Sequence, residues 1–131
     1  MSRLLLVAAC ALVDGDGRVL ICRRPEGKQL AGLWEFPGGK VEEGETDEEA
    51  LLRELQEEME IQVVIKERVI HVEHSYADYD IDFRVYRCEL LGGDVKHLRV
   101  HDHRWVLPSE LDRYEFPAAD EKTMRMLLAL E

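Results

Sequence analysis

The sequence predicts an α+β fold, with strands in the middle and two main helices packed against them. Many of the apolar residues fall into short, partly β-branched runs bounded by glycine-containing turns, a pattern typical of strands. One internal segment and the C-terminal segment instead carry apolar residues at helical spacing. The 131 residues, 46% of them hydrophobic, suit one domain with one core, and we expect residues 1–131 to form it.

The N-terminal half is predicted to begin with a hairpin, because Asp14-Gly15-Asp16-Gly17 between two apolar runs is a strong turn signal. A glycine-containing polar stretch and a short third strand follow, and Pro37-Gly38-Gly39 is expected to stop that strand. In order, the expected segments are a strand at 4–13, a strand at 18–23, a loop at 25–32 and a strand at 34–36.

The first helix is predicted to begin after Thr46, since Glu49 three residues later completes a capping box. Its apolar face contains Ala50, Leu51, Leu55 and Met59. The remaining expected segments are strands at 63–71, 81–90 and 104–107, a linking segment at 76–80, a turn at 91–94, a turn or helix from Pro108 and a final helix at 119–130.

The charge, the cysteines and the apolar runs of the sequence limit the ligands and the cellular setting that we expect. The formal charge of −11 argues against a binder of nucleic-acid polymers, which would present a basic face. A small phosphorylated ligand remains compatible, because a metal ion can lie between two anions. Cys10, Cys22 and Cys88 lie in apolar runs without a CxxC motif, so we expect buried free thiols and a cytoplasmic protein. No apolar run is long enough to span a bilayer.

The predicted helix concentrates negative charge on one face. Glu54, Glu57 and Glu58 are spaced by three and four residues, so they lie one turn apart and would repel one another. A divalent cation removes that repulsion, and carboxylate oxygens suit Mg²⁺ or Mn²⁺. Arg53 can hold a carboxylate by a forked pair, and Glu45 is its candidate partner. A solvated acidic face is the alternative interpretation of these glutamates.

The surrounding residues favour the metal site, because they resemble the Nudix box, G-x5-E-x7-R-E-U-x-E-E-x-G-U, where U is apolar. The matching residues are Gly39, Glu45, Arg53, Glu54, Leu55, Glu57, Glu58 and Ile61. One position departs from the box: Glu60 stands where glycine usually ends the helix in a left-handed conformation, at a penalty of roughly 1 kcal/mol for another residue.

The resemblance implies an α/β/α sandwich around a mixed sheet and hydrolysis of nucleoside diphosphates linked to another moiety. It implies that Glu54, Glu57 and Glu58 bind the metal, together with the backbone carbonyl of Gly38. Arg53 would then orient these ligands with support from Gly39 and Glu45. The metal, Mg²⁺ with Mn²⁺ as the alternative, would activate a water for attack at phosphorus.

Further segments are similar to the MutT subfamily: Cys22-Arg23-Arg24-Pro25, residues 32–40 and Phe116-Pro117-Ala118-Ala119-Asp120. This subfamily contains 8-oxo-dGTP diphosphatases, which sanitise the nucleotide pool for DNA replication and repair, and relatives that act on CTP, dCTP or modified cytosine nucleotides. Both release a nucleoside monophosphate and pyrophosphate. We therefore expect a small nucleotide as substrate, 8-oxo-dGTP first and a cytosine nucleotide second, and a monomer or weak homodimer. A non-catalytic nucleotide sensor is the alternative from another class.

The resemblance also suggests how a nucleotide is recognised. Arg24 matches a nucleotide-contacting position, Phe36 a pocket wall, and Tyr76, Asp78 and Tyr79 a loop facing the pocket. Asp120 matches the residue that hydrogen-bonds the base. Each has a simpler alternative: a solvated strand end for Arg24, core packing for Phe36, packing of the tyrosines on their own turn, and a helix N-cap for Asp120.

The catalytic base departs from the MutT pattern, in which a Glu precedes the strand that contains Trp105. Val100 occupies that place, so we expect Asp102 or a flanking histidine to substitute, or else Glu54 or Glu57 to take the role. Three histidines lie nearby, at positions 97, 101 and 103. Because no cysteine accompanies them, we interpret them as parts of an exposed polar loop rather than as a zinc site.

Overall fold

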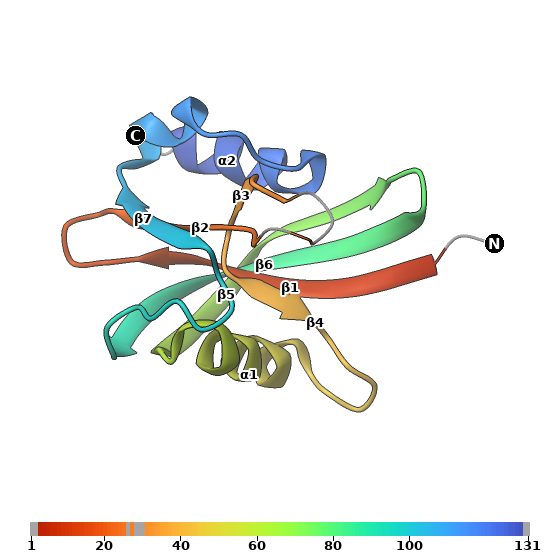
Figure 1. Ribbon diagram of the computed structural model, residues 1–131, viewed down its shortest axis with the longest axis horizontal. Coiled ribbons are helices and arrows are strands. Elements are labelled where there is room, and N and C mark those ends of the chain that lie inside the picture. The colour runs from red at the N-terminus through yellow and green to blue at the C-terminus, as the bar shows by residue number, and fades with distance from the viewer. Residues whose placement is uncertain (1–2, 26, 28–30, 130–131) are drawn as a thin grey trace.

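The computed structural model describes residues 3–25, 27 and 31–129. Within them, seven strands form one mixed sheet with the order β3-β2-β1-β6-β5, while β4 pairs with β1 and β7 pairs with β2. β1 and β6 are parallel, and the other pairs are antiparallel. Helix α1 covers one face of the sheet and helix α2 the other (Figure 1), which confirms the predicted sandwich.

The elements follow the predicted order along the chain. They are β1 (Arg3–Val13), β2 (Val19–Arg23), β3 (Trp34–Glu35), β4 (Gly38–Lys40), α1 (Asp47–Met59), β5 (Gln62–Ser75), β6 (Tyr79–Gly92), β7 (Asp102–Val106), the 3-10 helix η1 (Pro108–Arg113) and α2 (Ala118–Ala129). Residues 26 and 28–30 of the expected loop, and Leu130 of the expected final helix, lie outside the described residues.

The strand boundaries differ from the expectations in two places. The strand at Trp34 ends before Pro37-Gly38-Gly39 as expected, but Gly38 and Gly39 then begin an unexpected strand, β4, and pair with Ala9 and Ala8 of β1. The segment at 76–80 is also shorter than expected, since β5 continues to Ser75 and β6 starts at Tyr79. Hydrophobic alternation fades in these polar strand ends, while the backbone pairing continues.

The two-residue repeat of β1 divides the core between the two faces of the sheet. Ala8, Cys10 and Leu12 face α1, where they pack with its buried side chains, among them Leu51, Leu55 and Met59. Ala9 and Ala11 face the opposite side, with Phe36, Phe116 and Leu127. Each large aliphatic side chain that α1 buries contributes about 2 kcal/mol, which anchors the polar face of the helix in a fixed direction. The three cysteines are buried and free, as predicted.

Both ends of α1 follow from local sequence. Thr46 accepts a hydrogen bond from the Glu49 amide at 3.1 Å, and the Glu49 carboxylate accepts one from the Thr46 amide at 3.0 Å, so the predicted capping box is present. At the other end Glu60 has φ 56° and donates its backbone N–H to the Gln56 carbonyl. The left-handed helix end of the Nudix box is therefore kept without its glycine.

Candidate active site

Two glycines bring β4 against α1. Gly38 has φ +149°, and a Cβ there would lie 2.1 Å from the backbone oxygen of Ala8. A Cβ on Gly39 would lie 2.3 Å from Cδ of Glu54. Because real Cβ atoms do not approach other atoms this closely, both positions need glycine for different reasons: Gly38 for its contact with β1, and Gly39 to leave room for the Glu54 carboxylate.

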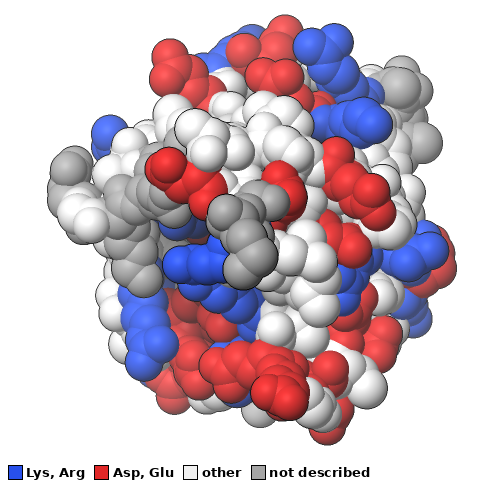
Figure 2. All heavy atoms as spheres, turned by 90° about the vertical axis from the view of Figure 1, so that its right-hand side faces the viewer, with Lys and Arg blue, Asp and Glu red and all other residues white. Residues whose placement is uncertain are grey.

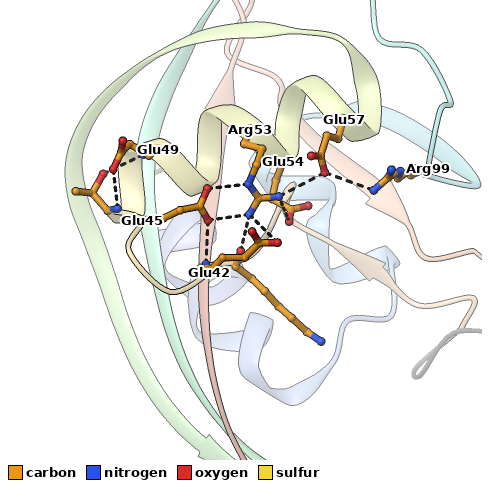
Figure 3. Close-up of polar contacts among 9 residues, drawn as sticks. Glu42, Glu45, Glu49, Arg53, Glu54, Glu57 and Arg99 are labelled. Atoms are coloured by element: carbon orange, nitrogen blue, oxygen red, sulfur yellow. Dashed lines mark hydrogen bonds and ion pairs between the residues drawn. The ribbon is translucent and has the colours of Figure 1, made fainter.

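Arg53 organises the carboxylates around it (Figure 3). Its guanidinium grips Glu45 through two hydrogen bonds, Nε to Oε2 at 2.7 Å and Nη2 to Oε1 at 2.9 Å. Nη1 donates to Glu54 at 3.0 Å and to Glu57 at 3.4 Å, and Nη2 also donates to the Lys40 carbonyl at 3.0 Å. One arginine thus joins the loop before α1, β4 and two glutamates of the helix face.

Charge pairing within this network keeps Glu45 and Arg53 ionised. The hydrogen bonds from Arg53, with a second from the Glu42 amide, lower the pKa of Glu45 from 4.5 to about 2. The hydrogen bonds of Arg53 to Glu45, and after them its contact with Glu54, raise the pKa of Arg53. Arg53 therefore stays cationic and oriented, and it offsets part of the repulsion among the glutamates.

The three glutamates of the predicted metal site lie on one face of α1, but their carboxylates point differently. Glu54 and Glu58 line a cavity together with Gly38 and Gly39. Glu57 instead turns toward Arg53 and toward Arg99, whose Nη1 lies 3.4 Å from its Oε2 (Figure 3). Among the described residues, the oxygens of these three side chains do not all approach within 4.8 Å of one another.

The cavity has a volume of about 490 Å³, enough for a nucleotide-sized ligand. Its floor is formed by the sheet, its acidic end by the α1 glutamates and its opposite end by α2 and the β5–β6 turn. The cationic residues of its lining are Arg3, Arg24, Lys40 and Arg99. This arrangement sets positive charge and carboxylates around one opening, as expected for metal-assisted binding of phosphates.

Asp120 and Phe36 form the end of the cavity away from the glutamates. Asp120 is only 6% exposed, and its Oδ1 accepts a long hydrogen bond of 3.5 Å from the Phe36 amide. Burial, followed by the negative charge of Glu35, raises the pKa of Asp120 well above 3.8. The cap interpretation of Asp120 is wrong, because α2 begins two residues earlier at Ala118. The ring of Phe36 is buried and stacks on Phe116 with centroids 5.2 Å apart.

Arg24 and two tyrosines also line this end. Arg24 Nη1 contacts Glu35 Oε2 at 2.7 Å, so Arg24 is an ordered wall residue rather than a solvated strand end. Tyr76 accepts a hydrogen bond from the Ala119 amide at 2.9 Å, and its ring lies 5.1 Å from that of Tyr79. Both tyrosines line the cavity, whereas Asp78 is exposed and is absent from its lining.

Asp102 lies on β7, outside the cavity lining. Its carboxylate accepts hydrogen bonds from its neighbour's amide, His103 N at 2.8 Å, and from Arg104 Nη1 at 2.6 Å. Desolvation raises the pKa of Asp102, but these two hydrogen bonds outweigh it, so the pKa is lowered. Val100 is buried in the core on the α1 side, which leaves its place without a proton acceptor.

The side chains suit a hard divalent cation. Glu54, Glu57 and Glu58 supply only oxygen donors, and the Gly38 carbonyl is a further candidate from the cavity lining. The contacts of Glu57 with Arg53 and Arg99 show that cations already neutralise part of this charge. On the face in Figure 2, the described Lys and Arg side chains are scattered among Asp and Glu rather than joined in one basic area.

A family model described as NUDIX domain matches residues 8–126. The chain belongs to the Nudix family. It is 32% identical over 129 residues to a CTP pyrophosphohydrolase of Escherichia coli, covering 96% of this chain and 93% of that protein. It is 40% identical over 121 residues to a putative 8-oxo-dGTP diphosphatase 2 of Mycobacterium tuberculosis, covering 88% and 82% respectively.

Structural comparison gives the same result. The solution structure of a MutT protein from Staphylococcus aureus matches this Nudix hydrolase with a TM-score of 0.78 at 31% identity, with each chain covered completely. No helix in the described residues is both long and apolar enough to cross a membrane.

Sequence reasoning missed several residues of the Nudix site. Arg99, Lys40 and Arg3 line the cavity, and Glu35 lines it beside Arg24. Glu35 and Lys40 lie in the MutT-like segment 32–40 but were not singled out there, and Arg3 and Arg99 are isolated basic residues without a pattern that separates them from ordinary surface charge. Only the pairing of β4 with β1, and of the segment before β7 with the end of α1, brings them together.

Proposed function

We propose that this Nudix hydrolase is a Mg²⁺-dependent nucleoside triphosphate pyrophosphohydrolase. It takes a nucleoside triphosphate and water and releases a nucleoside monophosphate and pyrophosphate. The observation that carries the proposal is the cavity with Glu54 and Glu58 at one end and buried Asp120 at the other. We assign the glutamate end to the phosphates and the Asp120 end to the base.

At the phosphate end, Glu54, Glu57 and Glu58 would hold Mg²⁺, which would supply positive charge for the phosphates and activation of the attacking water. Arg53 restrains the Glu54 and Glu57 carboxylates through its Nη1 hydrogen bonds at 3.0 and 3.4 Å. Arg99, which lies beside Glu57 and lines the cavity, is placed to contact the phosphates. These residues supply positioning and electrostatic stabilisation, which dominate phosphoryl-transfer catalysis.

At the base end, the raised pKa of Asp120 favours its neutral carboxyl. A neutral carboxyl offers one donor and one acceptor, which an ionised carboxylate does not. That pair complements the 8-oxoguanine edge, where O6 accepts and N7–H donates. It opposes the same edge of guanine, where both atoms accept. We therefore propose 8-oxo-dGTP as the preferred substrate, used in sanitising the nucleotide pool.

Cytosine nucleotides are the second candidate. The same carboxyl can donate to cytosine N3 and accept from its amino group, and the relative of E. coli that covers 96% of this chain is a CTP pyrophosphohydrolase. A non-catalytic sensor is a weaker candidate, because all three box glutamates are present.

A panel of nucleoside triphosphates, assayed with Mg²⁺ and with separate detection of pyrophosphate and phosphate, tests the proposal. We expect pyrophosphate as product and the highest kcat/KM for 8-oxo-dGTP, with dGTP at least tenfold lower. A higher kcat/KM for CTP or 5-methyl-dCTP would transfer the assignment to cytosine nucleotides. Nucleotide binding without turnover at any Mg²⁺ or Mn²⁺ concentration would indicate a sensor.

The setting proposed for the enzyme is the cytoplasm, as a monomer or weak homodimer. Three buried free thiols support a reducing compartment. Sedimentation of the purified protein across a range of concentrations tests the oligomeric part of this proposal.

A further inference from the structure

The segment between β6 and β7 is held against the end of α1 (Figure 1). The backbone amides of Leu98 and Arg99 both donate to the Glu58 carbonyl at 3.1 Å, and that of Lys96 donates to the Met59 carbonyl at 3.1 Å. These bonds satisfy carbonyl groups that the helix end cannot pair internally. The segment therefore has a fixed backbone next to the catalytic glutamates.

Two histidine rings contact each other here, that of His97 in this segment and that of His103 in β7. His97 Nε2 lies 2.7 Å from His103 Nδ1, and the ring centroids are 4.9 Å apart at an angle of 69°. The carboxylate of Asp102 completes the group, because one donor atom from each of the three residues lies within 4.8 Å of the others. His101 belongs to the same segment but not to this group.

In place of the polar-loop interpretation of these histidines, we propose that His97, Asp102 and His103 bind one zinc ion, at a site separate from the Mg²⁺ site on α1. Two imidazoles and one carboxylate are a donor set that Zn²⁺ prefers and Mg²⁺ does not. At Zn–N distances of about 2.05 Å, tetrahedral donors lie roughly 3.3 Å apart. The ring nitrogens would separate by about 0.6 Å from their present 2.7 Å, a side-chain movement only.

The surroundings support the proposed zinc site. His103 and Asp102 are fixed on β7 by pairing with Cys22 and Arg23 of β2, so two of the three donors have a rigid base. Arg104 and the His103 amide hold the Asp102 carboxylate in place, as outer partners of metal ligands do. The fourth position would be open to water, and exposed His97 would allow the ion to exchange.

A bound zinc ion would link the segment between β6 and β7, through His97, to strand β7, through Asp102 and His103. In a second group among the described residues, His71, Glu73 and Asp82, one donor atom from each side chain also lies within 4.8 Å of the others. It contains one imidazole rather than two, which favours Zn²⁺ less. This group on the β5–β6 hairpin could compete for zinc, so the experiment must distinguish the two sites.

The test is nitrogen-15 NMR of the histidine rings during titration with Zn²⁺, in excess Mg²⁺ to occupy the glutamate site. At one equivalent we expect the rings of His97 and His103 to shift, while that of His101 does not. His97→Gln should weaken zinc binding at least tenfold and abolish any zinc-induced rise in Tm. His101→Gln, from the same segment, is the matched control and should bind zinc as the wild type does.

Three results would overturn the zinc proposal: unshifted His97 and His103 rings at one equivalent, loss of zinc binding in Glu57→Gln, or its loss in His71→Gln. His97 is exposed, so His97→Gln should fold normally and should keep its Mg²⁺-dependent activity in zinc-free buffer. The zinc proposal therefore stands or falls independently of the pyrophosphohydrolase assignment.

Discussion

Replacing Gly39 by alanine should separate catalysis from stability. The added Cβ would lie 2.3 Å from Cδ, 2.5 Å from Oε2 and 2.7 Å from Cγ of Glu54. Restoring an ordinary contact requires the carboxylate to retreat by about 1 Å, and a displacement of that size can reduce activity about 100-fold. Because the clashing atoms end a flexible side chain, we expect a stability loss of only about 1 kcal/mol. Pyrophosphate release and urea denaturation measure the two effects.

Gly92→Ala is the matched control, because a Cβ there would meet nothing within 4 Å and the backbone is not left-handed. It should retain wild-type activity and stability. Gly38→Ala should behave differently from both, since its Cβ would press on backbone atoms of β1 and lower stability most. Full activity in Gly39→Ala would refute the placement of Glu54 at the metal site.

Three further predictions concern single side chains. Glu60→Gly should raise the free energy of unfolding by up to about 1 kcal/mol, because glycine relieves the strain of the left-handed backbone at this position. A lower free energy of unfolding would mean that loss of the Glu60–Lys96 ion pair at 2.9 Å outweighs the relief of strain. Asp120→Asn should flatten the dependence of stability on pH. Because the pKa of Asp120 is raised in the folded protein, wild-type stability should fall as pH rises above 3.8, by at most about 1.4 kcal/mol per pH unit, until the folded pKa is passed. An unchanged slope in the variant would contradict a buried neutral carboxyl. Arg53→Lys loses the forked grip on Glu45 and should lower kcat/KM by about 10- to 100-fold with little change in Tm, whereas an unchanged kcat/KM would rule out a positioning role.

Sequence reasoning reached the parts of the Nudix site that lie close together in the chain. The capping box fixes where α1 begins, the apolar positions fix which face is buried, and the remaining face must then carry Glu54, Glu57 and Glu58. These are local rules of helix geometry, so one sequence is enough to apply them.

The end of the cavity that contains Asp120 and Phe36 depends on contacts that no local rule supplies. Asp120 and Phe36 are 84 residues apart, and only the packing of α2 on the sheet joins them. The interpretation of Asp120 as a helix cap is wrong because α2 already begins at Ala118, directly after Pro117. Likewise, His97 pairs with His103 rather than with His101, which is nearer in sequence. The backbone anchoring of Leu98 and Arg99 at the Glu58 carbonyl is a non-local contact that fixes this segment beside β7.

The most direct test of the central claim is the Mg²⁺ dependence of pyrophosphate release by wild-type protein, Glu57→Gln and Glu48→Gln. Glu48 is an exposed glutamate of the same helix outside the cavity lining, so its variant controls for loss of one negative charge from α1. The metal-site account predicts wild-type turnover in Glu48→Gln and at least a 100-fold loss in Glu57→Gln at saturating Mg²⁺. Equal turnover in the two variants would contradict it.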